Sequence, residues 1–162
     1  MRIRNRRWLG ALIVAATVAV PVSVTAMISA ASAIAIPNAC TVLSAVQPQN
    51  SIATGKNVTP GKPKTTSSTA VGKACSEVVG SLTVYLDLSK YAGGWGGVKV
   101  TSETHPSGLG ASDLLVVGTG LGGGGPVDFI NFHRAGIYAS VSADGASASG
   151  LTALARLIYK RL

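Results

Sequence analysis

Two cysteines, Cys40 and Cys75, are the residues of this 162-residue chain whose type and number most directly suggest chemistry. In an oxidising compartment an even number of cysteines predicts a disulfide, here one that closes a loop of about 35 residues and stabilises the fold by roughly 4 kcal/mol. A lipid-modified Cys40 is one alternative, although Pro37-Asn38-Ala39 lacks the Leu-like residue expected three positions before such a cysteine. A metal or redox pair is another, but no Cys-x-x-Cys and no nearby histidine support it.

The two histidines, His105 and His133, are the candidates for acid–base catalysis. A catalytic zinc takes three protein ligands, so both would need a carboxylate from elsewhere in the chain. No Gly-x-Ser-x-Gly motif is present, and the acids are scattered: Glu77, Asp87, Glu103, Asp113, Asp128 and Asp144. We therefore predict no catalytic residue, no metal and no cofactor. A small secreted hydrolase that uses either histidine with an acid from a sheet is the alternative.

Gly118, Gly120 and Gly123 follow a short apolar run and match the G-x-G-x-x-G pattern of dinucleotide sites. That pattern must open a helix, whereas here further glycines and Pro126 follow. The remaining chain is also too short to complete a doubly wound sheet. The segment is better explained as the connection of a hairpin.

The amino terminus has the order of an export signal. Arg2, Arg4, Arg6 and Arg7 precede a run of 27 uncharged residues, 9–35, which ends in small residues. The A-x-A pattern predicts cleavage after residue 33 or 35, although the run is also long enough for an uncleaved membrane anchor. The paired arginines also suggest a twin-arginine signal.

The chain carries a charge of +8, but the four arginines of the signal contribute half of it. Without them ten basic residues face six acids, a charge of +4. Aromatic residues make up only 5% of the chain and are not interleaved with basic ones, so we expect no nucleic-acid partner. With 12% charged and 47% hydrophobic residues, the composition also excludes a disordered polyampholyte, a coiled coil and a collagen-like fibre.

A polar stretch at 47–73 carries four lysines and no acid. We predict a long basic loop, held at both ends by the disulfide, that contacts an anionic envelope polymer or a membrane surface through Lys56, Lys62, Lys64 and Lys73. A solvated loop without a partner is the alternative. Asn57 begins an N-glycosylation sequon, which would matter only in a eukaryotic secretory pathway.

The remaining patterns predict an α+β domain over 36–162: an antiparallel sheet built from hairpins, with a short N-terminal helix and a C-terminal amphipathic helix. Helical spacing appears at 40–46 and 151–162, and alternating apolar residues predict strands at 81–88 and 136–142. A strand at 127–133 is expected to pair antiparallel with 136–142, and shorter strands are expected at 98–101 and 114–117. We expect the final helix to cover one face of the sheet.

Several of these features together resemble one group of proteins: Cys40-Thr41-Val42-Leu43, a second cysteine before a strand, Gly108-Leu109-Gly110-Ala111 and a closing helix with Leu154-Ala155-Arg156. The chain is similar to the small two-cysteine exported proteins and lipoproteins of actinobacteria that are described as domains of unknown function. In that group an acidic residue commonly follows the Gly-Leu-Gly, and a lipidation motif is usual; this chain lacks both. The resemblance implies an envelope-facing α+β domain with a disulfide and no catalytic residue.

We therefore predict an exported protein, secreted or associated with the cell envelope, that acts as a non-catalytic binding or interaction domain. The alternatives are the small secreted hydrolase and a membrane-anchored accessory subunit that keeps residues 9–35 as a helix. No specific protein partner follows from the sequence.

Overall fold

The computed structural model describes residues 34–52, 58–93, 98–110, 114–120 and 126–162. Within these ranges the chain has the predicted α+β fold, with helices and strands in the order α1 (Ala39–Val46), α2 (Gln49–Ile52), β1 (Lys64–Ser68), β2 (Gly72–Val79), β3 (Leu82–Ser89), β4 (Val98–Thr104), β5 (Leu114–Gly120), β6 (Pro126–Arg134), β7 (Ile137–Ala143) and α3 (Ala148–Arg161). Residues 1–33 of the predicted signal, Lys56 and Asn57 lie outside the described residues.

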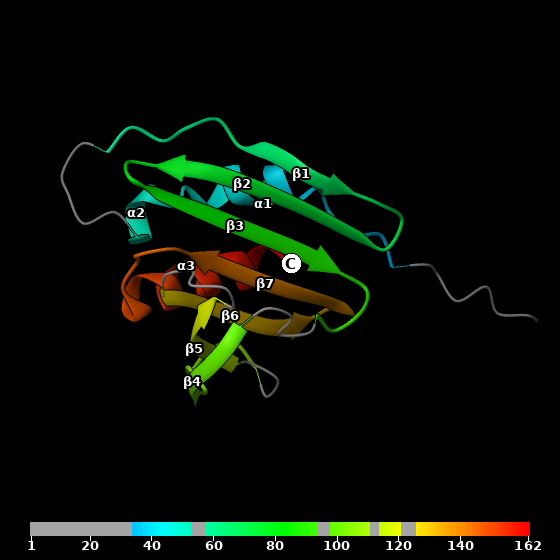
Figure 1. Ribbon diagram of the computed structural model, residues 1–162. Helices are drawn as coiled ribbons and strands as arrows, with labels where there is room; N and C mark the ends of the chain where they lie inside the picture. The colour runs from blue at the N-terminus through cyan, green and yellow to red at the C-terminus, as the bar shows by residue number, and fades with distance from the viewer. Residues whose placement is uncertain (1–33, 53–57, 94–97, 111–113, 121–125) are drawn as a thin grey trace, which may run out of the picture. The chain divides into compact units, whose positions relative to one another are not determined.

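The described strands form one antiparallel sheet in the order β1-β2-β3-β7-β6-β5-β4. Hairpins join neighbours in sequence, but β3 pairs with β7 rather than with β4, as Figure 1 shows for the green β3 and the orange β7. Thr119 of β5 pairs with Pro126 of β6, so the two strands form a hairpin. Gly118 and Gly120, which the sequence places in the connection, belong to β5, and Gly123 lies outside the described residues.

The hydrophobic core lies between one face of this sheet and the helices. The predicted alternation is confirmed, since Val84, Leu86 and Leu88 of β3 are completely buried and every second residue of β7 is buried. Helix α1 packs on β2 and β3, and α3 packs on β6 and β7. We call this side of the sheet the core face, and the side whose residues alternate with it the outer face. Phe129 and Phe132 of β6 are both buried, but three positions of separation put them on opposite faces.

Helix α1 confirms the predicted N-terminal helix, with Val42, Leu43 and Val46 buried. It begins where the side-chain oxygen of Asn38 accepts hydrogen bonds from the backbone N–H groups of Cys40 (2.9 Å) and Thr41 (3.1 Å). It ends before Pro48, which cannot continue the hydrogen-bonding pattern.

Helix α3 confirms the predicted C-terminal helix but starts at Ala148, three residues earlier than expected. Residues 148–150, which precede the expected helix, therefore form part of its first turn. The Ser147 hydroxyl accepts from Gly150 N–H at 3.1 Å and so caps the helix. The residues at 148–150 are small, so the hydrophobic pattern from which the helix was predicted does not extend to its first turn. Leu151, Leu154 and Ile158 are fully buried, as their helical spacing predicts.

The described part of the segment between β4 and β5 contributes Leu109 to the hydrophobic core and is hydrogen-bonded to α3. Leu109 is 0% exposed and lies between Gly108 and Gly110, whose φ angles of 88° and 100° suit glycine. The Arg156 guanidinium donates to Ser107 O (2.8 Å) and to Ser107 Oγ (3.1 Å). These contacts fix the far end of the sheet to the helix that covers its core face.

Residues 47–73 do not form one long loop. They contain α2 and β1, and β2 begins at Gly72. All five side chains of β1 are exposed, so the sequence shows no hydrophobic alternation from which this strand could be predicted. Backbone pairing with β2 forms this edge strand, and its Thr and Ser side chains tolerate both solvent and extended backbone.

One carboxylic acid is buried on the core face of β2. Glu77 is 4% exposed, and its Oε2 makes no hydrogen bond with any residue that the structure describes. Burial raises the pKa of this carboxyl group. Because the pKa is higher in the folded than in the unfolded chain, stability is greatest below the unfolded pKa and falls as pH rises through the folded pKa.

We expect Glu77→Gln to raise the free energy of unfolding, and to raise it by about 1 kcal/mol more at about pH 8 than at about pH 4. The reason is that desolvation destabilises the ionised carboxylate, which is present only at the higher pH. Urea unfolding at both pH values measures this difference. Glu103→Gln, on the exposed side of β4, makes the same chemical change without burial and serves as the control. An equal effect of Glu77→Gln at both pH values would contradict the prediction.

Candidate functional site

The sheet register brings five small or polar residues into one row across the outer face. Successive cross-strand partners from β1 to β6 are Ser67, Ala74, Asp87, Ser140 and Asn131. Neighbouring strands lie about 4.8 Å apart, so consecutive members of the row are in side-chain reach of one another. The row crosses the β3–β7 boundary, where segments more than 50 residues apart in sequence become adjacent.

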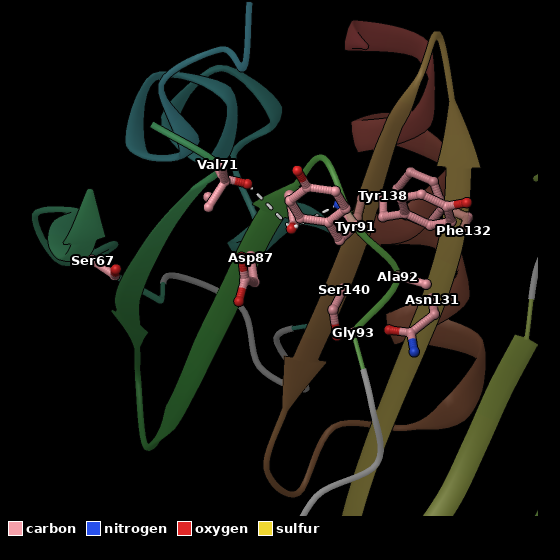
Figure 2. A pocket seen from close by; sticks show the side chains of 13 residues that line it. Ser67, Val71, Asp87, Tyr91, Ala92, Gly93, Asn131, Phe132, Tyr138 and Ser140 are labelled. Carbon is pink, nitrogen blue, oxygen red and sulfur yellow. Dashed lines mark hydrogen bonds between the residues drawn. The ribbon is translucent and has the colours of Figure 1, made fainter. Parts of the chain in front are cut away.

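A cavity of about 400 Å³ lies over this row. Asp87, Ser140 and Asn131 contribute to its floor, and the chain just after β3 (Tyr91 to Gly93) passes over it, as Figure 2 shows. Cavities of this size accommodate small organic molecules, which are usually held by apolar walls and a few convergent polar groups. The arrangement is therefore that of a small-molecule pocket.

Hydrogen bonds fix the chain that passes over the cavity. Ser89 Oγ donates to Val71 O at 3.3 Å and accepts from Tyr91 N–H at 3.1 Å, as the dashed lines in Figure 2 indicate. Lys90 N–H donates to the same Val71 carbonyl at 3.0 Å. The residues after β3 are thus hydrogen-bonded to the β1–β2 hairpin, and these bonds hold one wall of the cavity in position.

The polar groups of the floor are the Asp87 carboxylate, the Ser140 hydroxyl and the Asn131 amide, and the last two can both donate and accept hydrogen bonds. Burial raises the pKa of the Asp87 carboxyl group above its ordinary value. The Oδ1 atom of Asn131 is buried and has no hydrogen-bond partner among the described residues. That oxygen has almost no accessible surface, whereas the side chain of Asp87 is exposed, so Asp87 is the acceptor that a ligand in the cavity would reach.

Tyr138 lines the cavity, and its ring packs against that of a histidine on the neighbouring strand. The rings of His133 and Tyr138, cross-strand partners in β6 and β7, have centroids 4.4 Å apart with planes inclined by 33°. His133 therefore lies in the neighbouring row of the outer face, two strands away from Asp87, and its ring packs against a residue of the cavity wall. His105 follows β4 and is exposed, and it does not line this cavity. Over the described ranges, no three His, Cys, Asp or Glu side chains are grouped to hold a metal ion.

The predicted disulfide between Cys40 and Cys75 is confirmed, with an S–S distance of 2.05 Å and Cα atoms 5.1 Å apart. It joins α1 to the core face of β2, on the opposite side of the sheet from the cavity. Its position is structural, because Cys75 is completely buried.

The four lysines predicted as a contact surface have different surroundings. Lys62 and Lys64 are exposed beside and on the edge strand β1, whereas Lys56 lies outside the described residues. Lys73 belongs to β2 and is half-buried, and its Nζ donates to the backbone carbonyl of Ile36 at 2.7 Å. An ammonium group engaged inside the fold is poorly placed to contact a polymer, so only Lys62 and Lys64 remain candidates here.

Sequence reasoning missed Asp87, Ser140 and Asn131 as a group. The signal available was that each is a polar residue between two apolar neighbours in the sequence. Such alternation is also the ordinary pattern of a solvated sheet face. Only the pairing of β3 with β7 makes these residues neighbours.

Comparison with known proteins gives this chain no relative: no family model, no curated protein and no solved structure matches it. Across the residues that the structure describes, no helix has the length and apolar character needed to cross a membrane.

Proposed function

We propose that this protein is an exported, non-catalytic binding domain that holds a polar group of a cell-envelope polymer in the outer-face cavity. The observation that carries the proposal is the cavity itself, with a polar floor shared by three strands and walls fixed by hydrogen bonds. The disulfide and the signal-like amino terminus support an extracytoplasmic location.

Binding, rather than catalysis, fits the residues that line the cavity. Asp87 is the acid–base group among the described lining residues, and its neighbours in the floor, Ser140 and Asn131, supply no second acid–base group to work with it. His133 is one row away and stacked on Tyr138. The lining supplies hydrogen-bonding groups and aromatic surface, which are the means of recognition.

The exposed Lys62 and Lys64 provide a second, weaker contact in this proposal. Both lie next to or on β1, the strand that contributes Ser67 to the cavity lining. Exposed ammonium groups would attract an anionic envelope polymer or membrane surface, and salt would screen that attraction over about 8 Å. Washing with salt therefore separates the two contacts.

The test places a bulky side chain in the cavity. We expect Ser140→Phe to lower the fraction of the protein retained on the envelope of the producing cells at least about tenfold after a high-salt wash, because the ring occupies the space of the ligand. Cell fractionation and quantitative immunoblotting of the full-length protein measure the retained fraction.

Ser142→Phe is the matched control. Ser142 lies two residues further along β7 on the same outer face, but it does not line the cavity. Equal retention of the two variants after the high-salt wash would contradict binding through the cavity. Retention of the wild type only in low salt would assign the attachment to the lysines instead.

A further inference from the structure

The residues at which the predicted signal ends are part of the folded domain. Ile36 is 6% exposed and belongs to the hydrophobic core. The end of the Ile34 side chain occupies the space in which a Cβ atom at position 136 would lie, so it packs against the glycine of the β6–β7 turn. Gly136 has a φ angle of 79°, which glycine adopts readily. Packing of the domain therefore includes residues that precede Ile36.

The backbone of Ile36 is held by a lysine. Lys73 is half-buried, and its Nζ donates to the carbonyl oxygen of Ile36 at 2.7 Å. In Figure 1 this segment, drawn in blue, lies at the end of the sheet where β2 begins. Standard backbone dimensions keep the nitrogen and the oxygen of one residue within about 3.6 Å of each other. The backbone nitrogen of Ile36 therefore lies within about 7 Å of the Lys73 ammonium group.

The A-x-A pattern allows two cuts, and they have different consequences for this arrangement. A cut after Ala35 would make the Ile36 nitrogen a terminal ammonium group, at a buried residue and close to a second positive charge. Burial and a nearby like charge both disfavour an ionised group. The same cut would remove Ile34 and its contact with Gly136. A cut after Ala33 would instead place the new charge on Ile34, which is 46% exposed.

The two bonds also differ in their accessibility once the domain has folded. The bond before Ile36 joins an exposed residue, Ala35, to a residue of the core. Proteolysis takes place at exposed, weakly held segments, so this bond would be cut only while the chain is unfolded. The bond before Ile34 is followed by two exposed residues. Its carboxyl side therefore stays accessible after folding.

We propose that export processing cuts this chain after Ala33, so that the mature domain begins at Ile34 and keeps residues 34–36 as part of its fold. The step is a hydrolysis by the leader-cleaving peptidase of the exporting cell. Water breaks the peptide bond, Ala33 gains a carboxylate and Ile34 gains an ammonium group. This inference rests on the export that the proposed function includes, and it does not involve the cavity.

The intact mass of the protein that accumulates outside the cytoplasm identifies its first residue. The full-length chain is expressed in an exporting cell, and we expect the accumulated protein to consist of residues 34–162. A chain that begins at Ile36 would overturn the inference, and so would a chain that keeps residues 1–33.

Each of the two A-x-A patterns can be blocked separately. Ala31→Phe places a bulky side chain only in the pattern before the cut after Ala33, and Ala35→Phe does so only for the cut after Ala35. We expect Ala31→Phe to reduce the amount of chain that begins at Ile34 at least about tenfold, whereas Ala35→Phe should change it less than about twofold. The reverse result, or equal effects of the two variants, would overturn the inference.

The Ala31→Phe variant also tests the physical reason if the peptidase cuts it after Ala35 instead. Its product should unfold at a lower urea concentration than the mature wild-type protein, because its terminal ammonium group lies beside Lys73. Equal unfolding midpoints would show that the fold does not distinguish the two ends and would overturn the inference. Absence of any cut product would support it.

These measurements are independent of ligand binding. If the inference fails, the effect of Ser140→Phe on envelope retention still decides whether the proposed function survives. Conversely, a mature chain that begins at Ile34, together with equal retention of Ser140→Phe and Ser142→Phe, would overturn the proposed function and leave the inference intact.

Discussion

Removing the Cys40–Cys75 disulfide should lower the free energy of unfolding by about 4 kcal/mol, the largest loss that we expect from any change discussed for this protein. The bond joins residues 35 apart in sequence, and the loop that it closes contains α2 and the edge strand β1. All side chains of β1 are exposed, so the strand is held mainly by its pairing with β2, together with the contact of Thr65 Oγ1 with Cys40 Sγ at 3.5 Å. An unfolded chain without the bond gains the freedom of this whole loop.

Urea unfolding of the oxidised and reduced wild-type protein measures the effect without changing any side-chain volume. The double variant Cys40→Ala/Cys75→Ala should lose at least as much stability, since it also removes buried sulfur at the fully buried position 75. Hydrogen exchange should accelerate first at the β1 backbone amides. An unchanged unfolding midpoint in a sample whose mass proves complete reduction would refute the expectation.

Leu109→Ala should lower the free energy of unfolding by about 3 kcal/mol. Leu109 is completely buried in the core cluster, although it lies in a connection between two strands rather than in a helix or strand. The flanking glycines at positive φ and the Arg156–Ser107 hydrogen bonds hold this connection in place, so the cavity left by the shorter side chain cannot easily collapse. Chemical denaturation measures the change.

Leu157→Ala is the control for this experiment. Leu157 lies on the outward side of α3 and is 37% exposed, so the same truncation should cost less than about 1 kcal/mol. Comparable losses in the two variants would show that the Gly-Leu-Gly connection is not an anchor of the core.

Several elements of the fold could be predicted from short-range patterns. The alternation of Leu82, Val84, Leu86 and Leu88 predicts a strand at 81–88, which the structure has at 82–89. The helical spacing of Val42, Leu43 and Val46 likewise predicts α1. Both patterns report which side of a local segment meets the core, and that information is contained within a few residues.

The elements that were missed lack such a pattern. Edge strand β1 buries no side chain, and the first turn of α3 is made of small residues. Lys73 was assigned to a loop because its neighbours in sequence are polar, whereas its backbone pairs with β3 and its ammonium group contacts Ile36. In each case backbone hydrogen bonds or a distant carbonyl, rather than local hydrophobicity, determined the outcome.

By itself the sequence determined the α+β class, the disulfide and the core-facing side of the main strands, because alternation, helical spacing and cysteine number are local properties of the chain. The candidate site was decided only by the tertiary structure. Asp87 and Ser140 become neighbours because β3 pairs with β7, and no local pattern specifies which distant strand completes a pair. Asn131 joins them because β6 follows in the sheet, so the cavity belongs to the strand order.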